Sequence, residues 1–227
     1  MAIGLSAWAD EGMWLLPLIQ KLNAKSMKEA GLKLSPKDIY NTNGSSLKDA
    51  IVQFGGGCTG EVISGMGLVV TNHHCGYSSI QRLSSDEHNY LRDGFWAKNI
   101  REEIPAPGLS VTFLVSMRDV TEELAKKEKK LAKKNFGTEL QALMEKEKED
   151  LVESAKKANP HCDAELQTFY DGNVLYLMVY KTYRDVRLVG TPPASMGKFG
   201  GETDNWIWPR HTCDFSMFRI YTDPDGN

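Results

Sequence analysis

The sequence predicts a mainly β fold with α-helical insertions. Three observations support this prediction. Short β-branched runs punctuated by glycine and proline recur from Cys58 onward, at the spacing of a barrel or sandwich. One long stretch between them, residues 121–158, has helical spacing of its apolar residues instead. The 227 residues are 41% hydrophobic, which is enough to bury one large core.

Residues 12–55 are expected to form helices and connecting turns. The stretches EGMWLLPLIQKLN and SMKEAGLKL have helical apolar spacing, and SPKDIYNTNGSSLKDAIVQFGGG supplies helix caps and breakers. Strands are expected after this region, because β-branched and aromatic residues are enriched there. The predicted strand segments are EVIS, GLVVT, LSVTFLVSMRDV, VLYLMVYKTYRDVRLVG and DFSMFRIYT.

Residues 121–158 are expected to form a helical insertion in the β domain, interrupted at Gly137. Lysines and glutamates are interleaved along it, which predicts a solvated surface and not a binding patch. The apolar stripe is narrow. It consists of Leu124, Leu131, Leu140, Leu143, Leu151 and Val152.

The overall charge argues against two classes of partner. A net charge of -3 supplies no basic field for a nucleic-acid backbone or an anionic membrane surface. No apolar run approaches the roughly 20 residues that span a bilayer. Neither nucleic acid nor a membrane is therefore an expected partner.

The first residues resemble the end of an export signal. Ala7, Trp8 and Ala9 fit the A-x-A pattern that signal peptidase reads, so residues 1–9 are interpreted as a residual signal-peptide tail. A genuine, frayed N-terminus is the alternative. Four cysteines, an even number, agree with an oxidising compartment. A periplasmic or otherwise exported protein is expected.

The stretch GLVVTNHHCGYSSIQ, residues 67–81, carries two histidines and a cysteine after a β-branched run. Cys58 lies seventeen residues before Cys75, and the two flank a predicted hairpin whose ends return to neighbouring positions, within disulfide reach. Chymotrypsin-type peptidases place a catalytic histidine directly before such a cysteine, which here is His74, with His73 beside it. Zinc ligation by these residues and a buried core histidine remain alternatives, although the chain has no CxxC pair.

A catalytic triad also needs an acid and a nucleophile. Asp214 precedes a predicted strand and is the candidate that would orient His74. The order His, Asp, Ser would place the nucleophile after Asp214, where Ser216 lacks the glycine context of an oxyanion hole. Ser64 and Ser195 precede the acid and lack that context too. The nucleophile is therefore expected to be missing, and the turn sequence YTDPDGN suggests that the chain stops within a loop.

Several blocks of sequence together resemble one family. They are DEGMWLLP, GGGCTGEVISGMGLVVTNHHCGYSSIQ, LRDGFWA, EIPAPGLSVTFLV and GKFGGETDNWIWPRHTCDFSMFRIY. The chain resembles the N-terminal third of the dipeptidyl peptidase 7 and 11 family of bacterial serine exopeptidases. That resemblance implies the N-terminal barrel of a chymotrypsin-like double β-barrel. Residues 10–227 would be the His/Asp barrel, with the family's large helical domain and Ser-bearing barrel absent from this chain.

The resemblance also assigns site residues. His74 matches the catalytic base and Asp214 the acid, while Asn205 and Trp206 match residues that hold the free α-amino group of the peptide. A side-chain amide oxygen is chemically suited to accept from an ammonium group. Cys213 stands where the family is expected to have glycine; it either pairs with Cys162, the cysteine in NPHCDAEL, or is a free thiol.

The predicted function is that of a serine-type dipeptidyl aminopeptidase, a hydrolase that releases dipeptides from the N-terminus of oligopeptides. It needs no cofactor or metal, and this chain alone is expected to be an inactive fragment. The alternative is an exported, non-catalytic peptide-binding module. The sequence leaves open an acidic or apolar preference at the second substrate residue, and the oligomeric state, including a homodimer of the full-length protein.

Overall fold

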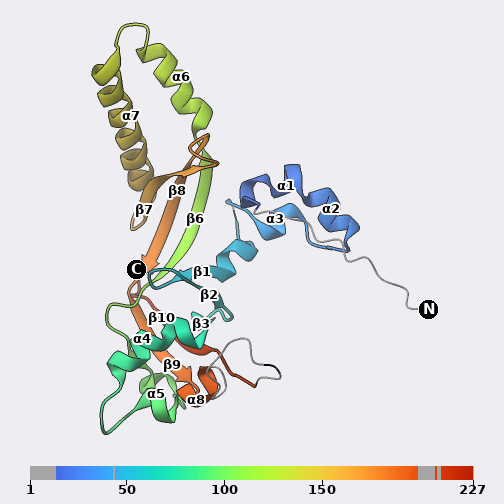
Figure 1. The fold of residues 1–227 in the computed structure, drawn as a ribbon, viewed down its shortest axis with the longest axis vertical. Coiled ribbons are helices and arrows are strands. Elements are labelled where there is room, and N and C mark those ends of the chain that lie inside the picture. The colour runs from blue at the N-terminus through green and yellow to red at the C-terminus, as the bar shows by residue number, and fades with distance from the viewer. Residues whose placement is uncertain (1–13, 43, 199–207, 209–210, 227) are drawn as a thin grey trace, which may run out of the picture. The chain divides into compact units, whose positions relative to one another are not determined.

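The computed structural model describes residues 14–42, 44–198, 208 and 211–226, in two compact units, Met1–Leu47 and Lys48–Asn227 (Figure 1). The described part of the first unit is helical, as predicted. Its helix α3 (Pro36–Ile39) is capped at its start by Ser35. The Ser35 hydroxyl accepts from the Asp38 N–H, and the Asp38 carboxylate accepts from the Ser35 N–H. The helices are η1 (Leu16–Leu18), α1 (Ile19–Leu22), α2 (Ala24–Glu29) and α3 (Pro36–Ile39).

The second unit is built on one antiparallel sheet, which has ten strands in the part of the chain that the structure describes. The mainly β prediction is thus confirmed, and each predicted strand segment overlaps at least one strand, although EVIS shares only Glu61 and Val62 with β2. The strands are β1 (Ile51–Phe54), β2 (Cys58–Val62), β3 (Leu68–Thr71), β4 (Phe95–Trp96), β5 (Ile104–Pro105), β6 (Val111–Asp119), β7 (Asp163–Phe169), β8 (Val174–Tyr183), β9 (Asp185–Thr191) and β10 (Ser216–Tyr221).

Four strands differ from the sequence-based prediction. β1 lies inside the stretch expected to be helices and turns, and β4, β5 and β7 lie in stretches for which no strand was predicted. β1 pairs with β2 and β6, and β7 pairs along its whole length with β8. Both are strands because a partner satisfies their backbone hydrogen bonds.

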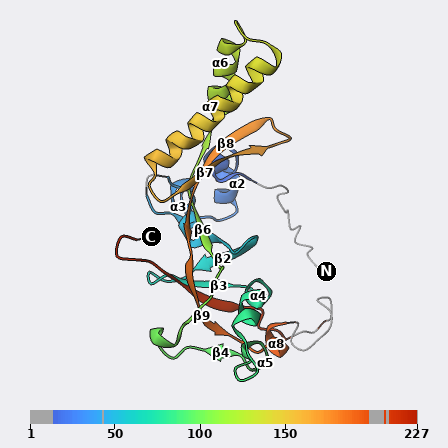
Figure 2. The same ribbon diagram turned by 90° about the vertical axis from the view of Figure 1, so that its left-hand side faces the viewer.

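The sheet is not closed, so the predicted barrel is not confirmed. Its spatial order is β4-β9-β10-β3-β2-β1-β6-β8-β7, with β5 added to β9. The segment between β5 and β6 bonds to both β9 and the end of β1. The N–H of Ala106 donates to the carbonyl of Val186 in β9, and the carbonyl of Ser110 accepts from the N–H of Gly55, directly after β1. Further along the chain, β6, β8 and β7 extend together away from the other strands of the sheet (Figures 1 and 2).

The main core lies against strands β1, β3, β9 and β10 and the start of β6. Burial alternates along β1, where Val52 and Phe54 point inward, as expected for a strand with one solvated face. Phe54 packs on Phe218 of β10 with ring centroids 4.9 Å apart, and Val69 of β3 is fully buried beside them. Each such side chain stabilises the fold by about 1.5–3 kcal/mol.

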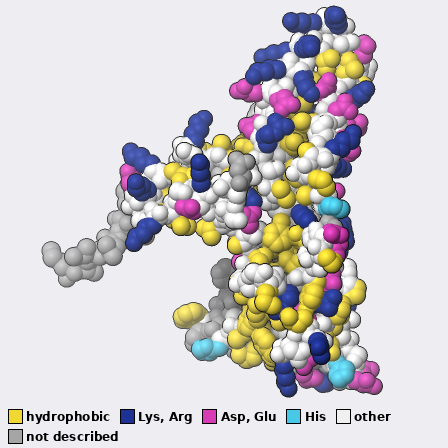
Figure 3. Space-filling view, turned by 180° about the vertical axis from the view of Figure 1, so that it is seen from behind, with side chains coloured by type: hydrophobic (Ala, Val, Ile, Leu, Met, Phe, Trp, Pro, Cys, Tyr) yellow, Lys and Arg dark blue, Asp and Glu magenta, His cyan; other side chains and the backbone are white. Residues whose placement is uncertain are grey.

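Helices α6 (Thr121–Leu131) and α7 (Gly137–Ala158) form the insertion predicted over residues 121–158. The break covers residues 132–136, and Gly137, which has φ 55, is the first residue of the second helix. Leu124 and Leu151 of the predicted stripe pack on the β7–β8 surface in a second core cluster. Charges of both signs are spread over the face of the α6–α7 helical insertion that Figure 3 shows.

The remaining helices are short and border the sheet. Helix α4 starts where β3 ends and carries four buried residues. None of the described helices is both long and apolar enough to cross a membrane. The remaining elements are η2 (Leu47–Ala50), α4 (His73–Leu83), α5 (Tyr90–Asp93), η3 (Ile100–Glu102) and α8 (Ala194–Gly197).

Candidate active site

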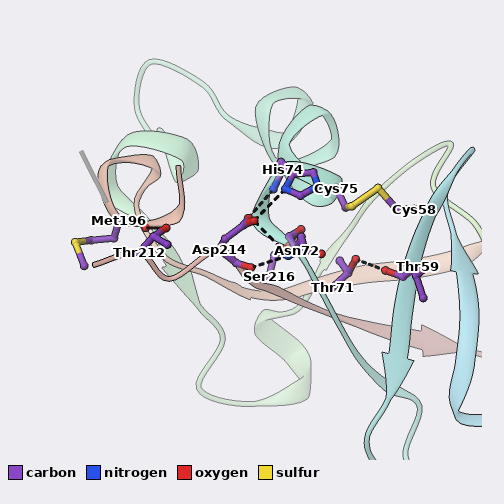
Figure 4. Close-up of polar contacts among 10 residues, drawn as sticks. All are labelled: Cys58, Thr59, Thr71, Asn72, His74, Cys75, Met196, Thr212, Asp214 and Ser216. Atoms are coloured by element: carbon purple, nitrogen blue, oxygen red, sulfur yellow. Dashed lines mark hydrogen bonds and ion pairs between the residues drawn. A yellow bond between two sulfur atoms is a disulfide. The ribbon is translucent and has the colours of Figure 1, made fainter. Parts of the chain in front are cut away.

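The predicted base and acid lie side by side, although 140 residues separate them in the sequence. Strand β3 pairs with β10 so that Thr71 faces Ser216. His74 follows Thr71 on the first turn of α4, and Asp214 precedes Ser216 by two residues. The register therefore brings the two side chains together, and His74 Nδ1 lies 3.0 Å from Asp214 Oδ2 (Figure 4).

The Asp214 carboxylate is held by the start of α4. Its Oδ1 accepts from the backbone N–H of His74 at 3.2 Å, and its Oδ2 accepts from Asn72 Nδ2 at 3.2 Å. Backbone N–H groups at a helix start lack partners within the helix and favour an anion. The helix thus holds the carboxylate at the position from which it reaches the imidazole.

The pair is open to solvent on the histidine side. The His74 side chain is 70% exposed and that of Asp214 is 33% exposed. With Nδ1 engaged by the carboxylate, the other ring nitrogen is the one available to a reacting group. The arrangement can therefore take up a proton from a nucleophile and stabilise the resulting imidazolium.

His73 occupies a different environment from its neighbour. It is 1% exposed, and its Nδ1 lies 3.1 Å from Thr191 Oγ1. A Cβ on Gly197 would come within 2.5 Å of the His73 ring, so a glycine is needed for this close approach. Burial lowers the pKa of His73, which keeps the ring neutral. His73 is thus a packing residue, and His74 is the histidine that chemistry can reach.

The predicted disulfide between Cys58 and Cys75 is confirmed, with the two Cα atoms 5.9 Å apart. It joins the first residue of β2 to the first turn of α4, directly after His74 (Figure 4). Because the two thiols are bonded to each other, they cannot serve as zinc ligands. Cys162 and Cys213 are free, so the bond considered between them is not formed.

The three serines considered as nucleophiles differ in accessibility. Ser216 is fully buried, and its hydroxyl donates to the Asn72 carbonyl at 3.2 Å, so it faces the core. Ser64 accepts two backbone N–H groups in the β2–β3 turn. Ser195 lies exposed on α8. None of these three has a described bond to the His74 ring.

Two predicted site residues, Asn205 and Trp206, lie outside the described residues. Conversely, the structure adds contacts that the sequence analysis did not predict: Asn72 against Asp214, and Thr191 and Gly197 against His73. Asn72 could have been noticed as a favoured helix N-cap residue before HHC. Thr191 and Gly197 offered no such indication, because their partner lies more than 100 residues away.

A solvent-exposed histidine–aspartate pair on an antiparallel sheet is the base–acid arrangement of chymotrypsin-type peptidases, so the site indicates a peptidase domain. The family model described as Peptidase S46 matches residues 9–227. The chain belongs to this family.

Curated relatives agree with that assignment. The chain is 54% identical over 224 residues to dipeptidyl-peptidase 7 of Phocaeicola vulgatus, covering 98% of this chain and 31% of the relative. It is 53% identical over 227 residues to the Asp/Glu-specific dipeptidyl-peptidase of Porphyromonas gingivalis, covering 97% and 31%. The chain thus spans about a third of the length of the curated relatives that it matches.

A solved structure shares the fold. Porphyromonas endodontalis DPP11 in complex with the dipeptide Arg-Glu matches with a TM-score of 0.81 and 45% identity. The match covers 96% of this chain and 32% of that one. The same protein in complex with substrate also gives a TM-score of 0.81. These homologues are dipeptidyl peptidases.

Proposed function

We propose that this chain is the base-bearing and acid-bearing part of a serine-type dipeptidyl peptidase, which releases dipeptides from the free N-terminus of oligopeptides. The observation that carries the proposal is the 3.0 Å contact between His74 Nδ1 and Asp214 Oδ2, on an imidazole that is exposed to solvent. Membership of the Peptidase S46 family supports the reaction type.

In the proposed mechanism, Asp214 accepts the Nδ1–H of His74 and so leaves the second ring nitrogen free to act as a base. That nitrogen takes the proton of a serine hydroxyl as the hydroxyl attacks the substrate carbonyl. The imidazolium then returns the proton to the leaving amine, and water hydrolyses the acyl-enzyme with the same base. The proposal places the nucleophilic serine outside these 227 residues, in the length that the relatives have in addition.

The substrate side of the proposal rests on the relatives. The structure of DPP11 with a dipeptide supports a peptide ligand. We assign recognition of the α-amino group to Asn205 and Trp206, by their place in the DNW block. A relative named Asp/Glu-specific dipeptidyl-peptidase and a relative named dipeptidyl-peptidase 7 match almost equally well, so similarity does not decide the preference at the second residue. Export is also part of the proposal, since a disulfide suits an oxidising compartment.

The experiment uses the full-length protein that carries this chain, with fluorogenic dipeptidyl substrates of acidic and apolar type. His74→Ala is expected to abolish turnover of whichever type is cleaved. His73→Ala is the matched control, because it removes the adjacent imidazole without touching Asp214, and it should keep much of the activity. Retained turnover in His74→Ala would refute the assignment, and dipeptide binding without any turnover by the unaltered protein would favour a binding module.

The isolated 227-residue chain provides a second test. We expect it to release no dipeptides and to remain unlabelled by a fluorophosphonate probe, because neither the nucleophile nor an oxyanion hole is assigned within it. Stoichiometric labelling of Ser64, Ser195 or Ser216 would show that the nucleophile lies within the chain.

A further inference from the structure

Asn72 stands at the N-cap of α4, but its side chain does not cap that helix. Asparagine is favoured at this position because its side-chain oxygen can accept an unpaired N–H of the first turn. Here Asp214 Oδ1 takes the N–H of His74 instead. The Asn72 amide is turned outward, and its Nδ2 donates to Asp214 Oδ2 at 3.2 Å and to the Asp214 carbonyl at 3.3 Å (Figure 4).

The Asp214 carboxylate is therefore held through both of its oxygens. Asp214 Oδ2 receives both Asn72 Nδ2 and the His74 ring nitrogen, and a carboxylate oxygen has lone pairs for two donors. Asp214 Oδ1 is held separately by the helix N–H. The Asn72 contact to the Asp214 carbonyl also ties down the backbone from which the carboxylate projects.

Asn72 is itself anchored through its backbone. Its carbonyl accepts from the hydroxyl of Ser216, which is fully buried. A Cβ on Gly76 would come within 2.5 Å of that hydroxyl, so Ser216 is confined between the helix and the sheet. The Asn72 amide therefore extends from a fixed point, although the residue is exposed to solvent.

We propose that Asn72 is a positioning residue that keeps the Asp214 carboxylate aimed at His74 Nδ1. This inference rests on the proposed function, in which that carboxylate orients the catalytic base. An exposed hydrogen bond competes with water, so its loss should alter stability little. The loss of orientation should appear in the chemical step, where small displacements of a reacting group have large effects.

The test compares Asn72→Ala and Asn72→Asp in the full-length protein. Asn72→Ala is expected to lower kcat about 10-fold with little change in KM, because one charge-assisted hydrogen bond is lost. Asn72→Asp should lower kcat further, since a carboxylate cannot donate to Asp214 and repels it. Aspartate caps helices as well as asparagine does, so a purely structural role for the side chain would leave Asn72→Asp unimpaired.

Asn89 offers a matched control. It is the N-cap of α5, and its Oδ1 accepts the Arg92 N–H at 2.9 Å, away from Asp214. Asn89→Ala and Asn89→Asp should retain the kcat of the unaltered protein. Melting temperatures of all four variants show whether each is folded.

The outcomes separate the inference from the function on which it rests. If His74→Ala is inactive while both Asn72 variants keep kcat within about twofold of the unaltered protein, the inference is overturned and the proposed function stands. If kcat falls in Asn72→Ala but not in Asn72→Asp, the inference is also overturned, and helix capping explains the effect. Turnover retained by His74→Ala would instead overturn the proposed function.

Discussion

Replacing Glu103 by alanine is expected to destabilise the β domain by about 3–5 kcal/mol, because it leaves the largely buried guanidinium of Arg219 without its counter-charge. The Glu103 side chain is 2% exposed, and Arg219 Nε lies 2.9 and 3.0 Å from its two oxygens. Tyr221 donates its hydroxyl to the same carboxylate at 2.7 Å. The Arg219 side chain is 15% exposed and also donates from Nη1 to the Met66 carbonyl at 3.0 Å, so without Glu103 a largely buried guanidinium keeps only a neutral partner among the described bonds.

Thermal unfolding followed by circular dichroism measures this effect. A loss of that size should lower the melting temperature by about 6–20 °C in a protein of this length. Asp93→Ala is the matched control, since it removes the carboxylate of an exposed pair with Arg92 and should leave the melting temperature unchanged.

A double-mutant cycle identifies the cause. Once Glu103 is absent, the further change Arg219→Ala should restore part of the loss, because no buried charge then remains unpaired. Effects of the two single variants that simply add, or a Glu103→Ala protein as stable as Asp93→Ala, would refute the reasoning.

Three further predictions concern the site and the sheet. Removing the disulfide with Cys58→Ser and Cys75→Ser should lower the free energy of unfolding by about 3 kcal/mol, read from urea titrations; equal midpoints before and after removal would contradict this. Gly197→Ala should push a methyl group into the His73 ring and lower the free energy of unfolding by about 1–3 kcal/mol, seen as a lower melting temperature. An unchanged melting temperature would show that the helix shifts to make room. Burial raises the pKa of Tyr180 to about 12, so the folded state holds this proton more tightly than the unfolded state. Stability should therefore fall as pH rises from about 10 to about 12, and Tyr180→Phe should reduce that fall in denaturation curves taken across the range.

The sequence by itself determined the features that depend on near neighbours. The β-branched runs predicted strands, because these residues suit a pleated, half-buried surface. Helical periodicity and Gly137 predicted α6, α7 and the break between them. The disulfide was also predictable, because the β2–β3 hairpin returns Cys58 and Cys75 to neighbouring positions. In each case the interaction that decides the structure lies within about 20 residues along the chain.

Other features were decided only by distant pairing. β7 became a strand through β8, and β1 through β2 and β6, against the local expectation for β1. The sheet stayed open because β6 and β8 continue outward as a ladder, which no local pattern predicted.

The two histidines show the same division most directly. His73 and His74 are adjacent and chemically identical in the sequence, so only the precedent of a catalytic histidine directly before a cysteine, and then the family resemblance, favoured His74. The helical start of α4 points the His73 ring into the interior beside Thr191 and the His74 ring toward Asp214. The β3–β10 register then supplies the carboxylate from 140 residues away, since backbone pairing and not sequence proximity sets which side chains meet.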